Sequence, residues 1–148
     1  MKSNLKRWTG KGKEFNQKGI LIYEGELFQG KKNGKGKEYN DKGQLIYEGE
    51  FLNGEKHGKG KIYDIDNNIE IESEFLNGKI SGISKTYKNG KLIKEIDYSK
   101  KYSTGKEYNE QGKLIFEGTF DDKYRSTGDY KDYYWNGNIK LEGKLHNE

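Results

Sequence analysis

The sequence repeats itself with a period of 24 residues, and this constrains the fold more than any other feature. The copy that begins at Gly34 reads "GKGKEYNDKGQLIYEGEFLNGEKH", and close copies begin at Gly10 and Gly58. A repeat this short is one supersecondary unit, which buries its apolar face only against its neighbours. We expect one domain over residues 1–148, with an N-terminal cap at 1–9 and repeats at about 10–33, 34–57, 58–81, 82–102, 103–125 and 126–148.

Each copy contains two strand-like runs separated by turn signals. The run "LIYEGEFL" (Leu45–Leu52) alternates between two faces, as a strand does. The preceding "NDKGQ" has Asn first and Gly fourth, which is typical of a type I turn followed by a left-handed glycine. After the run, residues Asn53 to Gly58 are expected to turn the chain before "GKGK" begins the next strand.

These runs predict an all-β fold: an elongated, single-layer antiparallel β-meander of consecutive hairpin repeats, with about a dozen strands and no long helix. Only 30% of the residues are hydrophobic and 35% are charged, so an ordinary two-layer core is hard to assemble. The 12 Tyr, 6 Phe and 2 Trp instead suit a thin, half-exposed sheet.

Aromatic rings and glycines are expected to form the core of this sheet together. Tyr47 and Phe51 would lie over glycines of adjacent strands, where the missing side chain leaves room for a ring. These glycines include Gly34, Gly36, Gly58 and Gly60. The expected aromatic–glycine face comprises Tyr23, Gly25, Gly36, Tyr47, Gly49, Phe51, Gly60, Phe75, Phe116, Gly118 and Phe120.

The segment "YEGEFLNGEKHGKGK" from Tyr47 to Lys61 resembles the MORN repeat, whose consensus is close to Y-x-G-x-F-x-x-G-x-x-H-G-x-G. Later copies, such as "YKNGKLIKE" from Tyr87, are similar to the bacterial variant of the repeat, some members of which are antitoxin components. The resemblance implies an extended single sheet that serves as a scaffold, a dimerisation arm or a lipid-contact module.

Three motifs that suggest ligand chemistry are better explained as turns. "GELFQGKK" (Gly25–Lys32) has the spacing of a phosphate loop, but Lys stands where Ser or Thr would hold magnesium, and no helix is expected after it. His57 has one other histidine in the chain and is expected in a turn. "DIDNN" (Asp64–Asn68) lacks the Gly and Glu of a calcium loop and is expected to be an altered hairpin turn. We therefore expect no metal and no cofactor.

Catalysis is not expected either. The glutamates of the repeats, such as Glu24 and Glu48, lie beside lysines on a face that should be solvated, whereas acid–base catalysis needs sheltered carboxylates. No Ser, His and Asp constellation recurs, and the chain has no Cys. The absence of Cys also fits a reducing compartment, so a cytoplasmic location is expected.

The C-terminal segment "DDKYRSTGDYKDYYWNGN" gathers the residue types that dominate protein interfaces. It has two interpretations, a cap that covers the last hairpin or a partner site, and both can hold. The candidate partner-binding residues are Tyr124, Arg125, Tyr130, Tyr133, Tyr134 and Trp135.

These observations predict a non-enzymatic protein–protein interaction module or scaffold that presents an aromatic-lined concave face and a charged face. One alternative is a small bacterial or phage-encoded inhibitor or antitoxin that blocks a toxin or a defence nuclease such as a CRISPR effector. Another is a lipid-headgroup-binding module, with weaker support because acids interrupt the lysines. The expected partner is a protein, with a homodimer as a further option. Direct nucleic-acid contact is not expected, because the formal net charge is only +4 and two residues are Arg.

Overall fold

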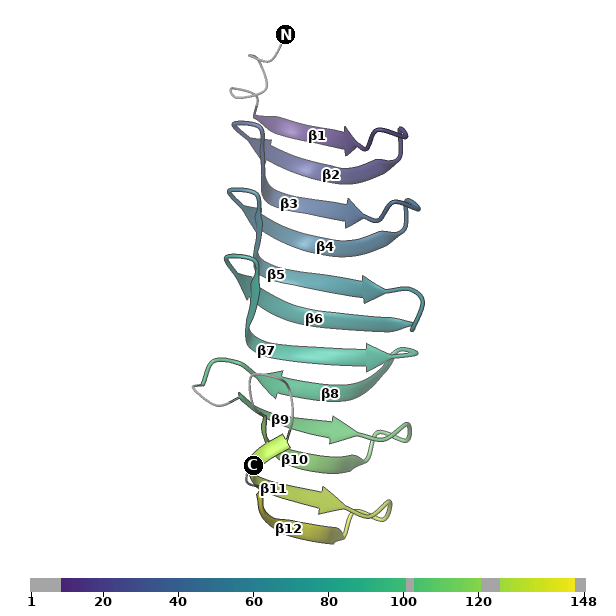
Figure 1. The fold of residues 1–148 in the computed structure, drawn as a ribbon, viewed down its shortest axis with the longest axis vertical. Coiled ribbons are helices and arrows are strands. Elements are labelled where there is room, and N and C mark those ends of the chain that lie inside the picture. Colours follow the sequence, from purple (N-terminus) through teal and green to yellow (C-terminus); the bar gives the residue numbers. More distant parts are fainter. Residues whose placement is uncertain (1–8, 101–102, 121–125, 146–148) are drawn as a thin grey trace.

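The computed structural model describes residues 9–100, 103–120 and 126–145, which form twelve strands of one open sheet (Figure 1). Their order in the sheet is their order in the chain, and every consecutive pair is antiparallel, so the predicted meander is confirmed. The strands are β1 (Gly10–Phe15), β2 (Leu21–Phe28), β3 (Lys31–Tyr39), β4 (Leu45–Leu52), β5 (Glu55–Asp64), β6 (Ile69–Leu76), β7 (Lys79–Lys88), β8 (Lys91–Asp97), β9 (Ser103–Tyr108), β10 (Leu114–Phe120), β11 (Ser126–Tyr133) and β12 (Ile139–Leu145).

The strands lie like rungs along the long axis of the molecule, with β1 at one end and β12 at the other (Figure 1). Each strand from β2 to β11 pairs with the strands before and after it in the chain, as expected of an array stabilised repeat by repeat. In the described part of the chain, no helix has the length and apolar character needed to cross a membrane.

The turns after β2, β4, β6 and β7 have only two residues. Asn53 and Gly54 have φ angles of 55° and 97°, and positive φ at both central residues is the mark of a type I′ hairpin turn. Asn and Gly tolerate this region best, which explains why "NG" recurs here. The predicted turn from Asn53 to Gly58 was therefore too long: β5 already begins at Glu55, and "GKGK" lies inside it.

The turns after β1, β3 and β9 have five residues and are organised by an asparagine. The backbone carbonyl of Asn40 accepts a hydrogen bond from the N–H of Gly43, and its side-chain carbonyl accepts two more from the N–H groups of Lys42 and Gln44. Gly43 has a φ of 75°, as predicted for a left-handed glycine that follows a type I turn. Asn16 and Asn109 make the same bonds in their own turns.

Two of the glycines named as seats for rings have another role. Gly34 and Gly58 have φ angles of 71° and 62° and lie at bulges, where the pairing register shifts. A Cβ added at Gly34 would lie 2.5 Å from the carboxylate of Glu26, and one at Gly58 would lie 2.6 Å from that of Glu50. These bulge glycines therefore face glutamates, and the expectation that they seat rings was wrong.

The core is a seam of interlocked rings on one face of β2 to β6, the aromatic face. Phe51 meets Tyr23 and Tyr47 edge to face, with ring centroids 5.5 Å and 5.2 Å apart, and Phe75 meets Tyr47 in the same way at 5.4 Å. Tyr23 and Tyr47 are fully buried although the sheet has a single layer. Such burial is possible because each ring lies on backbone where a side chain is missing.

Tyr47 lies over Gly49 of its own strand and Gly60 of the next strand. A Cβ added at Gly60 would come within 2.7 Å of two carbon atoms of the tyrosine ring. The Tyr47 hydroxyl donates a 3.1 Å hydrogen bond to the backbone carbonyl of Glu50, next to the register shift that separates Gly49 from Glu50 in the ladder. The ring thus fills the space above the glycines, and its hydroxyl provides a partner for a carbonyl at the bulge.

In the third hairpin, β5–β6, different residues fill the space above the sheet backbone. Ile71 stands where Tyr47 stands one repeat earlier, and Ser73 stands where Gly49 does. The Ser73 hydroxyl donates to the carbonyl of Glu74, the counterpart of the Glu50 carbonyl, at 3.2 Å. A smaller apolar side chain, together with a serine that supplies the missing hydroxyl, therefore replaces the tyrosine and glycine.

Candidate functional site

The aromatic face is closed by its own side chains. Phe51 and Phe75 are 3% and 4% exposed. The ammonium group of Lys32 lies 4.8 Å from the centre of the Tyr23 ring, and that of Lys56 lies 4.4 Å from the Tyr47 ring. These rings are committed to the core, so a partner cannot reach them without remodelling the sheet.

The opposite face, the charged face, holds a long groove of about 1200 Å³ across β1 to β7. Its floor is the backbone of a row of small residues, one from each strand, that includes Gly12, Gly25, Gly36, Gly49, Gly60 and Ser73. Two rows of lysines and glutamates form its walls. We expected the concave face to be lined by aromatic rings, whereas this hollow is lined by charged side chains.

The first charge row runs without interruption over all twelve strands. Every odd strand contributes a lysine and every even strand a glutamate, and each is the cross-strand partner of the next. The row comprises Lys13, Glu24, Lys37, Glu48, Lys61, Glu72, Lys85, Glu95, Lys106, Glu117, Lys131 and Glu142. Opposite charges that face each other across a ladder stabilise the pairing of their strands.

The glutamates of this row also bind tyrosines. The hydroxyl of Tyr39 donates to the carboxylate of Glu24 at 2.7 Å, and that of Tyr63 donates to Glu48 at the same distance. The bond from Tyr39, aided by Lys13, holds the pKa of Glu24 below its usual range, and it raises the pKa of Tyr39 to about 12. Lys61 lies 2.7 Å from both Glu70 and Glu72, and these contacts raise its pKa. From Lys13 to Glu95, each lysine of the first row therefore has an ion pair within the row.

The second charge row differs because its lysines have no ion pair within the described ranges. It consists of Lys11, Glu26, Lys35, Glu50, Lys59 and Glu74, all of them exposed. The glutamates fold over the bulge glycines, where Glu26 accepts a 3.4 Å hydrogen bond from the backbone N–H of Lys35. The three lysine ammonium groups remain available to a partner.

An apolar row accompanies the second charge row. Phe28, Leu52 and Leu76 follow Glu26, Glu50 and Glu74 by two residues on β2, β4 and β6, which places them on the same face of the sheet. Their exposed fractions are 47%, 43% and 55%. The charged face therefore presents three large apolar side chains at the spacing of the repeat. We did not expect this row, although the alternation of the strands could have indicated it.

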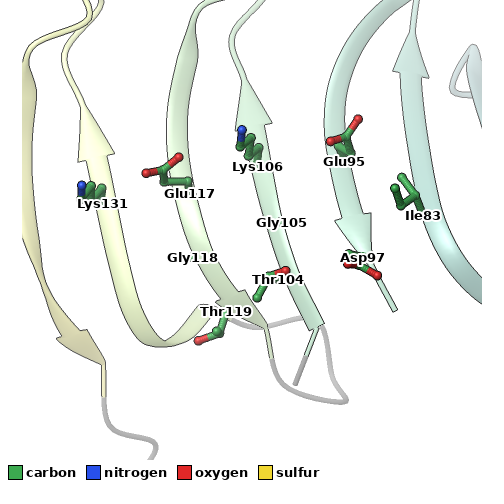
Figure 2. A pocket seen from close by; sticks show the side chains of 10 residues that line it. All are labelled: Ile83, Glu95, Asp97, Thr104, Gly105, Lys106, Glu117, Gly118, Thr119 and Lys131. Carbon is green, nitrogen blue, oxygen red and sulfur yellow. The ribbon is translucent and has the colours of Figure 1, made fainter. Parts of the chain in front are cut away.

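The groove continues into a second hollow of about 500 Å³ over β7 to β11. Figure 2 shows that Glu95, Lys106, Glu117 and Lys131 form one side of it, in continuation of the first charge row. The other side changes character, because Ile83, Asp97, Thr104 and Thr119 replace the lysines and glutamates of the second row. The groove over β1 to β7 thus has charged side chains on both sides, whereas the hollow over β7 to β11 has a charged side and a mixed side of apolar, hydroxyl and acidic side chains.

The predicted C-terminal partner residues are only partly described. Tyr124 and Arg125 lie outside the described residues, and for Tyr130 only the backbone, in β11, is described. Tyr133 ends β11, and burial together with a hydrogen bond to Glu117 raises its pKa. The partner site stays a prediction.

Tyr134 and Trp135 begin the turn between β11 and β12 and are 50% and 75% exposed. The ammonium group of Lys113, from the turn before β10, lies 5.4 Å from the centre of the Trp135 ring.

Within the expected aromatic–glycine face, Gly118 pairs with Gly105 and Phe116 is half-buried, while the side chain of Phe120 is not described.

Two motifs that were considered as ligand sites, His57 and the segment Asp64–Asn68, are part of the hairpin β5–β6. His57 lies in β5 opposite Glu50, not in a turn as expected, and its buried Nδ1 has no hydrogen-bond partner in the described part. Residues Ile65 to Asn68 form the hairpin turn between β5 and β6, as predicted. No cluster of three metal-ligating side chains occurs among the described residues.

These features define an all-β repeat protein built from hairpins, with one closed aromatic face and one grooved, charged face. A family model for the MORN repeat matches residues 23–44 and 47–69. The chain is therefore a MORN repeat protein, and such repeats generally act as protein- or membrane-interaction modules. A search of curated proteins finds no match.

Proposed function

We propose that the chain is a non-enzymatic protein–protein interaction module and that the N-terminal half of its charged face contacts the partner. The observation that carries this proposal is the second charge row, whose lysines are exposed and have no ion pair among the described residues, together with the apolar row of Phe28, Leu52 and Leu76. Apolar anchors beside charges are the arrangement found in protein interfaces, where the anchors give affinity and the charges give specificity.

The rigidity of the sheet favours this use. The anchors stand on paired strands that are joined by two-residue turns, so docking orders little of the backbone. A preformed surface loses less conformational entropy on binding than a flexible one does. The partner is expected to carry acidic groups for the lysines, and an apolar patch for the row of anchors.

The same face is less suited to an anionic membrane. Attraction to anionic lipids needs an excess of basic residues, whereas Glu26, Glu50 and Glu74 alternate one for one with the lysines of the second row. An alternating pattern at fixed spacing is complementary to a patterned protein surface. It is not complementary to a uniformly charged bilayer.

The test is affinity capture from the source cells with two surface variants. One carries Phe28→Ser, Leu52→Ser and Leu76→Ser, and the other carries Lys11→Gln, Lys35→Gln and Lys59→Gln. The control removes the same charge away from the groove, at the exposed positions Lys18, Lys42 and Lys88. We expect both surface variants to lose the same specific protein, and the control to retain it.

Two results would contradict the proposal. One is an unchanged partner list for folded surface variants, as judged by circular dichroism. The other is binding of the wild type to anionic vesicles that the lysine variant loses, with no protein captured. A third variant with Tyr133→Ala, Tyr134→Ala and Trp135→Ala tests whether the C-terminal aromatic residues contribute a second contact.

A further inference from the structure

Among the described residues, the strand at each end of the sheet is paired on one side only. Within the described residues β1 pairs only with β2, and β12 pairs only with β11. An edge strand exposes a row of N–H and C=O groups that can pair with another chain. The two edges lie at opposite ends of the molecule, so one molecule cannot join them to each other (Figure 1).

The two edges match each other in register. On β2 and β3, Glu24 faces Lys37 and Gly25 faces Gly36, which is how an even strand meets the next odd strand. β12 is an even strand and β1 an odd one. If β1 of a second copy followed β12, the equivalent pairs would be Glu142 with Lys13 and Gly143 with Gly12. The first charge row and the row of small residues would then both continue across the junction.

The apolar side chains match as well. Tyr47 covers the glycine of its own strand and Gly60 of the next odd strand. Leu141 holds the position of this tyrosine on β12, two residues before Gly143, and it is 54% exposed. Gly12 holds the position of Gly60 on β1, where no described strand precedes it. Leu141 of one copy would therefore cover Gly12 of the next.

From these three matches we infer that the chain associates with further copies of itself head to tail, by antiparallel pairing of β12 with β1 of the next copy. This contact is heterologous and leaves a free edge at each end, so it produces open chains of increasing length and no fixed dimer. One position does not match: Lys144 stands where Glu26 stands on β2 and would face Lys11 of the next copy.

The test uses cysteine cross-linking, because the chain has no cysteine of its own. Lys13→Cys and Glu142→Cys place thiols at positions that would be directly opposite, where side chains are close enough for a disulfide. After mild oxidation, we expect a covalent dimer when the two variants are mixed and little when either is alone. The control is Glu142→Cys mixed with Lys18→Cys, whose thiol lies in an exposed turn.

Other pairings give different products. A dimer from Lys13→Cys alone would show β1 against β1, and one from Glu142→Cys alone would show β12 against β12. Either would overturn the inference, as would a mixed dimer no more abundant than in the control. These variants leave the second charge row and the apolar row intact, so their failure would not count against the proposed function.

Charge variants provide a second, noncovalent test by sedimentation velocity. Glu142→Lys would place two lysines opposite each other and is expected to weaken self-association about tenfold. Lys13→Glu is expected to do the same, and a mixture of the two variants should associate again because their unlike ends match. Lys144→Glu should strengthen association. Self-association that is indifferent to all three substitutions would overturn the inference.

Discussion

The packing of Tyr47 on Gly60 can be tested by replacing the two residues with the types found 24 positions later, isoleucine and serine. Gly60→Ser places a Cβ within 2.7 Å of two carbon atoms of the fully buried Tyr47 ring. The ring cannot move aside, because Phe51 and Phe75 hold it edge to face. We expect this substitution alone to destabilise the sheet by about 1–3 kcal/mol, the usual effect of overpacking.

Tyr47→Ile alone removes most of the ring and the hydroxyl that bonds the Glu50 carbonyl. Truncation of a buried aromatic side chain to alanine costs roughly 3–5 kcal/mol, and isoleucine retains part of the packing, so we expect about 2–4 kcal/mol. In the double variant, the added serine occupies space that the ring has left. The chain already combines these two residue types 24 residues later, with Ile71 on β6 and Ser84 on β7.

The double variant is therefore expected to be more stable than the sum of the single effects predicts, by about 1–3 kcal/mol. The measurement is urea unfolding of the wild type, both single variants and the double variant. A control is Gly90→Ser, at a turn glycine whose added Cβ would have no atom within 4 Å. Its effect should simply add to that of Tyr47→Ile. Additive effects at Gly60 would refute the idea that ring and glycine form one unit.

Two further predictions concern the tyrosine hydroxyls. Tyr47→Phe keeps the ring but leaves the Glu50 carbonyl without its donor, which should cost about 1–3 kcal/mol in urea unfolding; a loss within error would show that another group replaces the hydroxyl. Burial raises the pKa of Tyr47 from its ordinary 10.0 to about 12, and the hydrogen bond to Glu24 raises the pKa of Tyr39 from 10.0 to about 12. Unfolded tyrosines release their protons first, so stability is fully present below pH 10 and falls as the pH rises towards 12. Unfolding free energies against pH should show this fall, with a shallower slope in Tyr39→Phe, and an equal slope in both proteins would contradict the assignment.

The fold could be predicted from the sequence because its signals are local and repeated. Alternation along Leu45–Leu52 predicts a strand, and "NG" or "NDKG" between strands predicts a hairpin. Each strand pairs with its neighbours in the chain, so the topology needs no long-range information. The error at Asn53–Gly58 arose because Gly58 was assigned to the turn, whereas its positive φ belongs to a bulge inside β5.

The charge rows could not be predicted, because they depend on register across strands. Bulges at Gly34 and Gly58 shift the pairing, and a shift of one residue moves a side chain to the other face. The sequence showed that Lys and Glu alternate along the chain, but not that Lys37 lies between Glu24 and Glu48 in space. For the same reason it could not separate Gly36, which seats the Tyr23 ring, from Gly34, which faces a glutamate.

The first charge row helps to select which strands pair, and the aromatic seam does not do this along the whole sheet. The seam changes its composition at Ile71 and Ser73, whereas lysines and glutamates alternate from β1 to β12. In a repeat array, strands from different repeats are alike, so an odd strand could pair with another odd strand. Such pairing would place lysine against lysine in this row, and pairing of even strands would place glutamate against glutamate. The alternation thus disfavours the wrong partners as well as stabilising the right ones. It acts at every junction between an even and an odd strand, including the one that β12 and β1 of two copies would form.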